Sequence, residues 1–290
     1  MMADRPVTQL NKSEVLSGLF AVWDDIDALL QGLPEAQWKA MTPLPGWDVQ
    51  AVVSHIIGTE SFLEGVAAPE PDTDVKAFDH VRNDIGAMNE CWVRHLSTET
   101  GSAVLEQYRT VTDGRRKVLE SMSVEDWNAQ TLTPAGPDSY GRFMRIRVFD
   151  CWMHEQDIRL ALQQPSSDDD LAGAASQLSL DEVAATMGFV VGKLAKAPDG
   201  SRVEFDLTGP LARTIRISVD GRAQLVEAFS GLGAPPACGG EPTAAIRVDA
   251  LQFTRLAGGR PMCPARAQDV ELAGDKDVAA RIVERLNFVI

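Results

Sequence analysis

The strongest constraint on the fold is a helical period that runs through most of the chain before Gln164. In residues 12–32, apolar side chains recur three or four positions apart, which is the spacing of one face of an α-helix. The same period, with few interrupting glycines or prolines, predicts further helices at about 48–66, 79–96, 102–122 and 140–162. Helices with one apolar stripe bury it by packing side by side, so we expect an antiparallel helical bundle.

Three breaks divide the chain into segments. Two of them, 42–46 and 133–137, are rich in proline and glycine and fall between predicted helices. The third, the polar stretch 164–170, is typical of a linker between domains. Because 290 residues suffice for two domains of ordinary size, we expect a first domain at 1–165 and a second at 166–290.

The periodicity changes after the linker. Residues 203–207 and 214–219 alternate apolar and polar side chains, as strands with one buried face do. A further strand is expected at 269–272, and helices are expected at 179–195, 243–257 and 275–287. The predicted fold is therefore a helical bundle followed by a small α+β domain.

Composition excludes several classes of partner. The chain carries 42 acidic and 27 basic residues, a formal charge of -15, which repels phosphate backbones and anionic lipid. Its longest apolar runs, such as 187–191, are too short to span a bilayer. Residues 1–14 lack the apolar core of a signal peptide. We therefore expect a cytoplasmic protein without nucleic-acid or membrane partners, while composition leaves the oligomeric state open.

The cysteines predict neither a disulfide framework nor an all-cysteine zinc site, because no Cys-x-x-Cys pair occurs. Cys151 directly follows Asp150, so its side chain is expected to point about 100° away from that carboxylate, into the core. Reduced thiols are expected throughout. The four cysteines are Cys91, Cys151, Cys238 and Cys263.

One histidine stands in an apolar setting. His55 lies seven residues into the helix predicted at 48–66, where an imidazole costs desolvation unless its nitrogens find partners. A hydrogen-bonded core histidine and a metal ligand are the two interpretations. His80 and His95 have charged or polar neighbours, and we interpret both as surface or capping residues.

Asp150 and His154 lie four residues apart in the helix predicted at 140–162, so they share one face. A carboxylate and an imidazole so placed can bind one ion together. The alternatives are a simple Asp–His hydrogen bond and a solvent-exposed pair. Combined with an inward His55, the pair supplies three ligands that suit zinc and leaves a fourth position open. Nickel, iron and manganese also suit such a donor set.

Two charged residues share the face of His154. Asp157 is a candidate to accept the free imidazole N–H and thereby orient the ligand. Arg147 has several possible roles: offsetting ligand charge, holding an anionic substrate, or forming an ion pair with Asp150 or with a neighbouring helix. The sequence does not choose among them.

Two motifs together resemble a known family. The first is PGWDVQ at 45–50, which leads into His55, and the second is RVFDCWMHEQDIR at 147–159. Both resemble the mycothiol-dependent maleylpyruvate isomerase family of actinobacteria. The helical half is similar to the DinB/YfiT-like metal-binding four-helix bundles. The last third is similar to the small sterol-carrier-like C-terminal domain of those isomerases, so the resemblance covers essentially the whole chain.

The resemblance implies metal ligands at His55, Asp150 and His154, with mycothiol as the thiol cosubstrate. The isomerase has glutamate where this chain has Asp150, and the shorter arm changes the reach of the carboxylate. The family also implies an arginine of the C-terminal domain near the metal. Its possible equivalents are Arg213, Arg216, Arg222, Arg247 and Arg260.

The implied function is a metal- and thiol-dependent enzyme. A cation with an open position binds a low-molecular-weight thiol and favours its thiolate, which adds to a small electrophile. Release of the thiol from an altered geometry gives isomerisation, and retention gives S-transfer. Two alternatives remain: a hydrolase that uses metal-bound water, and a non-catalytic protein whose C-terminal domain binds an apolar ligand. No catalytic side chain and no particular electrophile are predicted.

Overall fold

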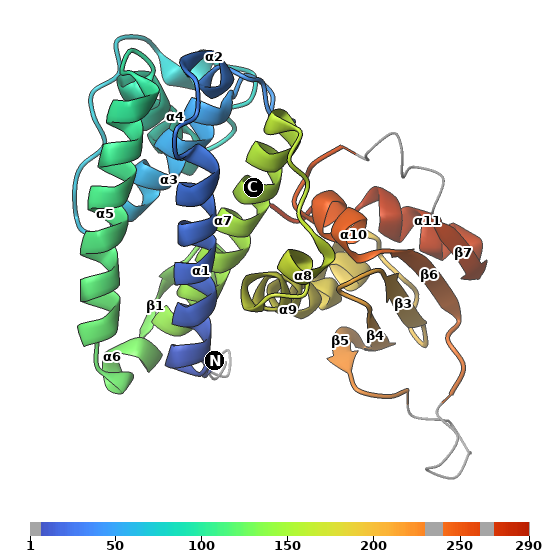
Figure 1. Ribbon diagram of the computed structural model, residues 1–290. Coiled ribbons are helices and arrows are strands. Elements are labelled where there is room, and N and C mark those ends of the chain that lie inside the picture. Colours follow the sequence, from blue (N-terminus) through green and yellow to red (C-terminus); the bar gives the residue numbers. More distant parts are fainter. Residues whose placement is uncertain (1–6, 230–239, 262–269, 290) are drawn as a thin grey trace. The chain divides into compact units, whose positions relative to one another are not determined.

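The computed structural model describes residues 7–229, 240–261 and 270–289, which form two compact units (Figure 1). The first unit extends to Ser167 and also includes Gly173–Ser179. The second contains Asp168–Ala172 and the residues from Leu180 onward. This division follows contacts within the chain, and the domain boundary between 165 and 166 stays a prediction.

Four long helices form the frame of the first unit in its described part. They are α1 (Lys12–Leu30), α3 (Val49–Leu63), α5 (Gly101–Ser121) and α7 (Tyr140–Leu162). Helix α1 packs against α5 and α7, and α3 packs against the same two helices, as in a four-helix bundle (Figure 1). The shorter α4 (Asp84–Leu96) packs on α3. The predicted helical limits agree with these, except that α4 begins five residues later than 79.

Apolar stripes and capping side chains place the helices. Along α1, the buried residues Val15, Leu19 and Val22 show the spacing that the sequence predicts. The Asp48 carboxylate accepts a hydrogen bond of 2.8 Å from the backbone N–H of Ala51 and so caps the first turn of α3. A cap of this kind contributes about 1 kcal/mol to helix stability. It fixes where α3 begins, and hence the positions along the helix axis of the residues that follow, His55 and Glu60 among them.

The break at 133–137 contains the turn of a β-hairpin, which the sequence did not predict. Strand β1 (Gln130–Thr133) pairs antiparallel with β2 (Gly136–Ser139). Gly136 occupies the left-handed region with a φ of 96°, which a residue with a side chain rarely adopts. The remaining short elements of this unit are α2 (Glu35–Trp38), η1 (Val75–Ala77) and α6 (Val124–Asn128).

Helices α3 and α4 approach each other closely at Gly58. A Cβ atom there would lie 2.5 Å from Cγ of the buried Trp92, so the Gly58→Ala variant must displace a packed ring. We expect it to lose about 1–3 kcal/mol of stability, although alanine normally favours a helix over glycine by about 1 kcal/mol.

Gly114 of α5 provides the matched control. A Cβ atom there meets only the flexible end of Glu64, at 3.3 Å, so Gly114→Ala should stabilise the protein by about 0.5–1 kcal/mol. Urea unfolding of both variants measures the difference. Equal changes in the free energy of unfolding would show that the contact with Trp92 is unimportant.

The second unit is built on a five-stranded sheet with the order β5-β4-β3-β6-β7. Strands β3 and β6 are parallel and the other neighbours are antiparallel. The strands are β3 (Arg202–Thr208), β4 (Arg213–Asp220), β5 (Arg222–Val226), β6 (Ala244–Asp249) and β7 (Glu271–Gly274). The α+β class predicted from the alternating pattern is confirmed.

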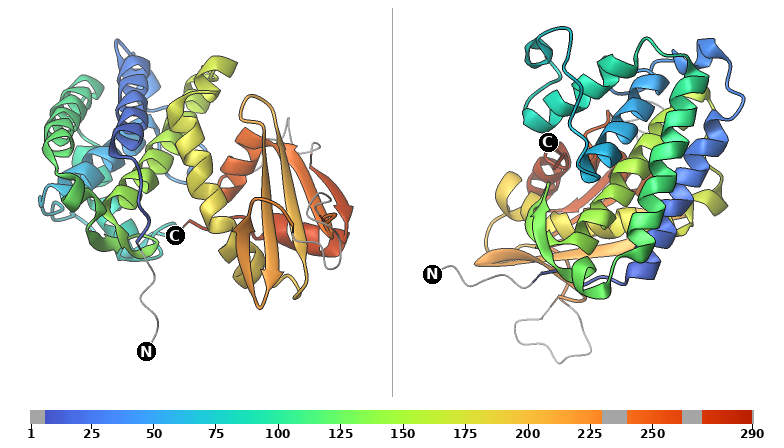
Figure 2. Two further views of the ribbon diagram at one scale, coloured as in Figure 1. Left: turned by 90° about the horizontal axis from the view of Figure 1, so that it is seen from below. Right: turned by 90° about the vertical axis from the view of Figure 1, so that its left-hand side faces the viewer.

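Helices complete this half of the chain. Helix α9 (Ala174–Phe189) continues into the π-helical turn η2 (Val190–Leu194). Together they correspond to the helix predicted at 179–195, but the observed helix begins earlier, at Ala174. Helices α10 (Ala250–Ala257) and α11 (Lys276–Glu284) pack against strands of the sheet, with α10 on β3 and β6 and α11 on β6 and β7 (Figure 2). Among the described residues, no helix is both long and apolar enough to cross a bilayer.

Two expectations for this half were wrong. The helix predicted at 243–257 is strand β6 followed by α10: Ala244, Ile246 and Val248 alternate inward, and the Asp249 side chain caps the new helix through the backbone N–H of Gln252. In addition, 164–170 is not wholly a linker, because α8 (Asp168–Leu171) begins within it.

Candidate metal centre

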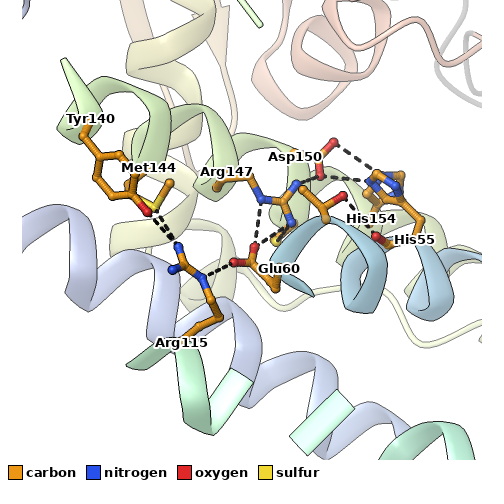
Figure 3. A network of polar contacts seen from close by, with 10 residues as sticks. His55, Glu60, Arg115, Tyr140, Met144, Arg147, Asp150 and His154 are labelled. Atoms are coloured by element: carbon orange, nitrogen blue, oxygen red, sulfur yellow. Dashed lines mark hydrogen bonds and ion pairs between the residues drawn. The ribbon is translucent and has the colours of Figure 1, made fainter. Parts of the chain in front are cut away.

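Three side chains from two packed helices meet inside the bundle. His55 comes from α3, and Asp150 and His154 come from successive turns of α7 (Figure 3). One ligand atom of each side chain lies within 4.8 Å of the others. The structure therefore brings together all three residues that the sequence predicts as ligands, although their role in holding an ion stays a prediction.

The spacing of the donor atoms fits a small divalent cation. His55 Nε2 lies 3.2 Å from Asp150 Oδ2, and His154 Nε2 lies 3.5 Å from Asp150 Oδ1. Ligands about 2.1 Å from a tetrahedral zinc ion lie about 3.4 Å from one another. The two imidazole rings, 4.8 Å apart at their centroids, both present Nε2 to the same carboxylate.

The cluster is enclosed around the imidazoles and accessible at the carboxylate. The His55 and His154 side chains are 8% and 6% exposed, whereas that of Asp150 is 32% exposed. Nδ1 of His55 is buried and has no hydrogen-bond partner among the described residues, so the ring has no second anchor there. A ligand can reach the cluster from the Asp150 side.

The electrostatics favour the protonation states that a metal requires. Burial lowers the pKa of His55, against the opposing effect of the Asp150 carboxylate, so this imidazole is neutral at pH 7. Burial alone would raise the pKa of Asp150, but Arg147 and the two histidines outweigh it and hold that pKa well below its ordinary value. A neutral imidazole and an ionised carboxylate are the ligand forms that bind divalent cations.

Asp157 lies behind one of the imidazoles. Its fully buried carboxylate places Oδ2 3.5 Å from His154 Nδ1, on the side of the ring away from Asp150. A carboxylate in this position orients a ligating histidine and raises its basicity. The geometry agrees with the role that the sequence predicts for Asp157.

Arg147 is engaged by protein partners on both sides. Its Nε donates to Glu60 Oε1 at 2.9 Å, its Nη1 donates to Asp150 Oδ2, and its Nη2 contacts Cys151 Sγ at 3.4 Å (Figure 3). The guanidinium is 4% exposed. Of the alternatives that the sequence leaves open, ion pairs with Asp150 and with a neighbouring helix are the ones present.

Sequence reasoning missed Glu60 and Arg115. Glu60 on α3 is fully buried and accepts from Arg147 through Oε1 and from Arg115 through Oε2, at 3.0 Å. Arg115 also donates to the hydroxyl of Tyr140 at 2.9 Å. One signal was available: Arg115 falls in line with the buried residues Tyr108 and Leu119 of α5, where an unpaired charge would not be tolerated.

Trp47 forms one wall of the cluster. A tight turn at Gly46, with a φ of 81°, directs its ring against both imidazoles, at centroid distances of 5.4 Å to His55 and 6.3 Å to His154. Its indole Nε1 donates to Glu90, which also contacts His80 Nε2 at 3.1 Å. His80 and His95 are both exposed, as the sequence predicts: His80 lies before α4 as a partner of Glu90, and His95 lies in the last turn of α4.

The described cysteines are not activated thiols. Cys151 is buried as predicted, and burial raises the pKa of its thiol to about 12. Burial also raises the pKa of the half-buried Cys91. Cys238 and Cys263 lie outside the described residues. Neither described thiol is ionised at neutral pH, so a thiolate at this cluster must come from another source.

Each of the five candidate arginines in the second unit has a partner there. Three pair with carboxylates, one contacts a side-chain amide and one donates to a backbone carbonyl. The contacts are Arg213–Asp181, Arg216–Glu204, Arg247–Asp206, Arg222–Gln224 and Arg260 with the carbonyl of Gly258. That one of them lies near the metal stays a prediction.

Two family models match the chain. Residues 19–159 match the mycothiol maleylpyruvate isomerase N-terminal domain, and residues 177–281 match the C-terminal domain of the same family. Uncharacterized proteins from two strains of Mycobacterium tuberculosis are 29% identical over 152 residues, which is 51% of this chain and 56% of theirs. The chain thus spans about half the length of these curated relatives.

Solved structures share the whole architecture. The crystal structure of the mycothiol-dependent maleylpyruvate isomerase matches with a TM-score of 0.58 and 15% identity, over 91% of this chain and 93% of that one. A histidine-to-alanine mutant of that isomerase matches with a TM-score of 0.56 and 16% identity over the same shares. At this level of identity the likeness concerns the fold, and it confirms a helical bundle followed by an α+β domain.

Proposed function

The chain belongs to the mycothiol maleylpyruvate isomerase family, and on that premise we propose that it is a metal- and mycothiol-dependent enzyme acting on a small electrophile. The observation that carries the proposal is the meeting of His55, Asp150 and His154, with donor atoms at the spacing of a metal coordination shell. Without that meeting, family membership alone would leave the chemistry open.

The three side chains fit one divalent cation, and zinc suits two imidazoles and a carboxylate best. When bound, such a cation lowers the pKa of a thiol ligand and serves as a Lewis acid. His55 contributes a neutral nitrogen, His154 contributes a second imidazole nitrogen, and Asp150 contributes one negative charge. Three protein ligands leave a position for the thiol, and the exposed side of Asp150 is the direction of approach.

The surrounding residues shape the reaction space. Asp157 holds the His154 ring, and Trp47 covers the imidazoles and excludes water from that side. The thiolate sulfur forms a bond to an electrophilic carbon of the substrate, and the π electron pair of the attacked double bond moves onto the conjugated, electron-withdrawing part of the molecule. Departure of the thiol after rotation in the adduct gives an isomer, whereas protonation of the adduct gives an S-conjugate.

The proposed substrate is a small electrophile other than, or in addition to, maleylpyruvate. The family resemblance implies glutamate at the position of Asp150, and aspartate holds its carboxylate one methylene group nearer to the backbone of α7, which would change where a cation is held. A different substrate geometry is the expected consequence. Products are therefore best identified by mass, without assuming either isomerisation or transfer.

The test follows thiol consumption and product formation with mycothiol and a panel of electrophiles that includes maleylpyruvate. We expect a rate at least tenfold above the uncatalysed reaction, a fall to that background with a chelator, and recovery when Zn²⁺ is added back. Equal rates with and without the chelator would remove the metal from the mechanism. Turnover without thiol would indicate a hydrolase, and no turnover under any condition would indicate a binding protein.

A further inference from the structure

The buried carboxylate of Glu60 lies next to the metal centre without belonging to it. We propose that Glu60 is a positioning residue: acting through Arg147, it determines which oxygen of Asp150 is presented to the metal. The inference rests on the proposed metal centre and adds a second layer of residues to it. Figure 3 shows the arrangement, with Arg147 between Glu60 and Asp150.

The first step is that Glu60 fixes the orientation of the Arg147 guanidinium. Both Nε and Nη2 of Arg147 lie 2.9 Å from Glu60 Oε1, so one edge of the group faces Glu60. The Nη1 atom points the other way and donates to Asp150 Oδ2. Because a guanidinium is planar and rigid, fixing one edge fixes the direction of the opposite N–H groups. Glu60 therefore aims a hydrogen bond at one chosen oxygen of Asp150.

The second step concerns which oxygen of Asp150 remains available to bind the cation. Asp150 Oδ2 accepts from Arg147 and also lies 3.2 Å from His55 Nε2, while Oδ1 faces His154 Nε2 at 3.5 Å and has no arginine partner among the described contacts. The carboxylate can then serve the metal through Oδ1 while Oδ2 stays bonded to the arginine. If Glu60 releases the guanidinium, Arg147 can rotate and bind both oxygens of Asp150, since two parallel hydrogen bonds are the preferred geometry of an arginine–carboxylate pair. Such a pair competes with the cation.

Charge acts in the same direction. Arg147 is a full positive charge beside a cation site, because an arginine side chain stays protonated in a protein. The Glu60 charge offsets that of Arg147 at direct contact. Losing it would leave the arginine to repel a divalent ion.

Arg115 keeps Glu60 in place. It binds the second carboxylate oxygen, Oε2, and is itself held by the hydroxyl of Tyr140. Each oxygen of Glu60 thus has its own arginine, one from α5 and one from α7, so the carboxylate cannot turn without breaking an ion pair. The contacts thus connect Tyr140 at the start of α7 with Asp150 on the same helix, by way of Arg115, Glu60 and Arg147.

The decisive variant is Glu60→Gln, which keeps the shape of the side chain and removes its charge. The matched control is Asp138→Asn, which neutralises a different buried carboxylate paired with an arginine, Arg142. That pair lies near the beginning of α7, about 12 Å from Asp150 along the helix at 1.5 Å per residue. The full-length proteins are compared by Zn²⁺ affinity in a chelator competition and by the visible absorption spectrum of the Co²⁺-loaded form. Circular dichroism checks that each variant is folded.

We expect Glu60→Gln to lower Zn²⁺ affinity by about 10–100-fold, the range found for groups that orient metal ligands, and to change the Co²⁺ spectrum. Asp138→Asn should retain both properties of the wild type. Unchanged affinity and spectrum in Glu60→Gln would overturn the proposal, as would equal losses in the two variants. If Glu60→Gln does not fold, Arg147→Lys decides by the same criteria, because lysine keeps the charge but lacks the rigid fork. A wild-type protein that binds neither ion would instead refute the metal centre itself.

Discussion

Purified His154→Ala protein is expected to contain only background metal, whereas the wild-type chain retains close to one equivalent. The substitution removes one of three protein ligands. Residues that merely orient a ligand change metal affinity by up to about 100-fold, so the loss of metal affinity in this variant should be larger. Elemental analysis of both proteins, purified in parallel, gives the answer directly. The remaining His55 and Asp150 cannot enclose an ion by themselves.

His95→Ala is the matched control for this experiment. His95 also lies on a helix of the first unit, but its side chain is exposed and outside the cluster. Its removal should leave the metal content unchanged. Equal, stoichiometric metal in the wild type and in His154→Ala would show that the ligand set is wrong, and the proposed reaction would have to be abandoned with it.

The second large effect concerns stability. Glu60→Ala removes the carboxylate that Arg115 and Arg147 share. Both positive charges then stay buried without the negative charge that lies between them. Breaking a buried ion pair in this way costs about 3–5 kcal/mol, because the surviving charges stay desolvated. We expect a fall of this size in the free energy of unfolding, measured by urea denaturation.

Glu64→Ala, four residues further along the chain, tests whether burial is the cause. Glu64 directly follows α3 and is exposed, so its loss should change stability by less than about 0.5 kcal/mol. Comparable losses in the two variants would indicate that the removal of a carboxylate, rather than the exposure of buried arginines to each other, decides the result.

The sequence predicted what depends on regular spacing. The apolar period of α1 and the i,i+4 relation of Asp150 to His154 are local properties of a helix, so both could be located without tertiary information. The hairpin at 130–139 was missed because its strands are four residues each, too short for an alternating pattern to stand out. Strand β6 was missed because it runs directly into α10, so one apolar segment contains two periods.

The charged residues around the candidate metal centre could not be predicted from the sequence, for a different reason. Glu60, Arg115 and Arg147 come from three helices, and only packing decides that one carboxylate lies between two guanidinium groups. A charged residue within an apolar stripe indicates that a partner exists, yet it does not say which one. Arg147 illustrates this. The sequence placed it on the face of α7 that carries His154, but only the packing of the helices shows that its partners are Glu60 and Asp150.

The cluster also has a mechanical consequence. His55 and Asp150 are 95 residues apart in the sequence, so an ion held by both would act as a cross-link that closes a large loop of the polypeptide. A ligand that binds only the folded state stabilises it, by about 2.7 kcal/mol at a free concentration of 100 times Kd. Metal binding and folding of the bundle would then be linked equilibria. The melting temperature would then rise with the concentration of free metal, and the protein without the ion would be less stable by that amount.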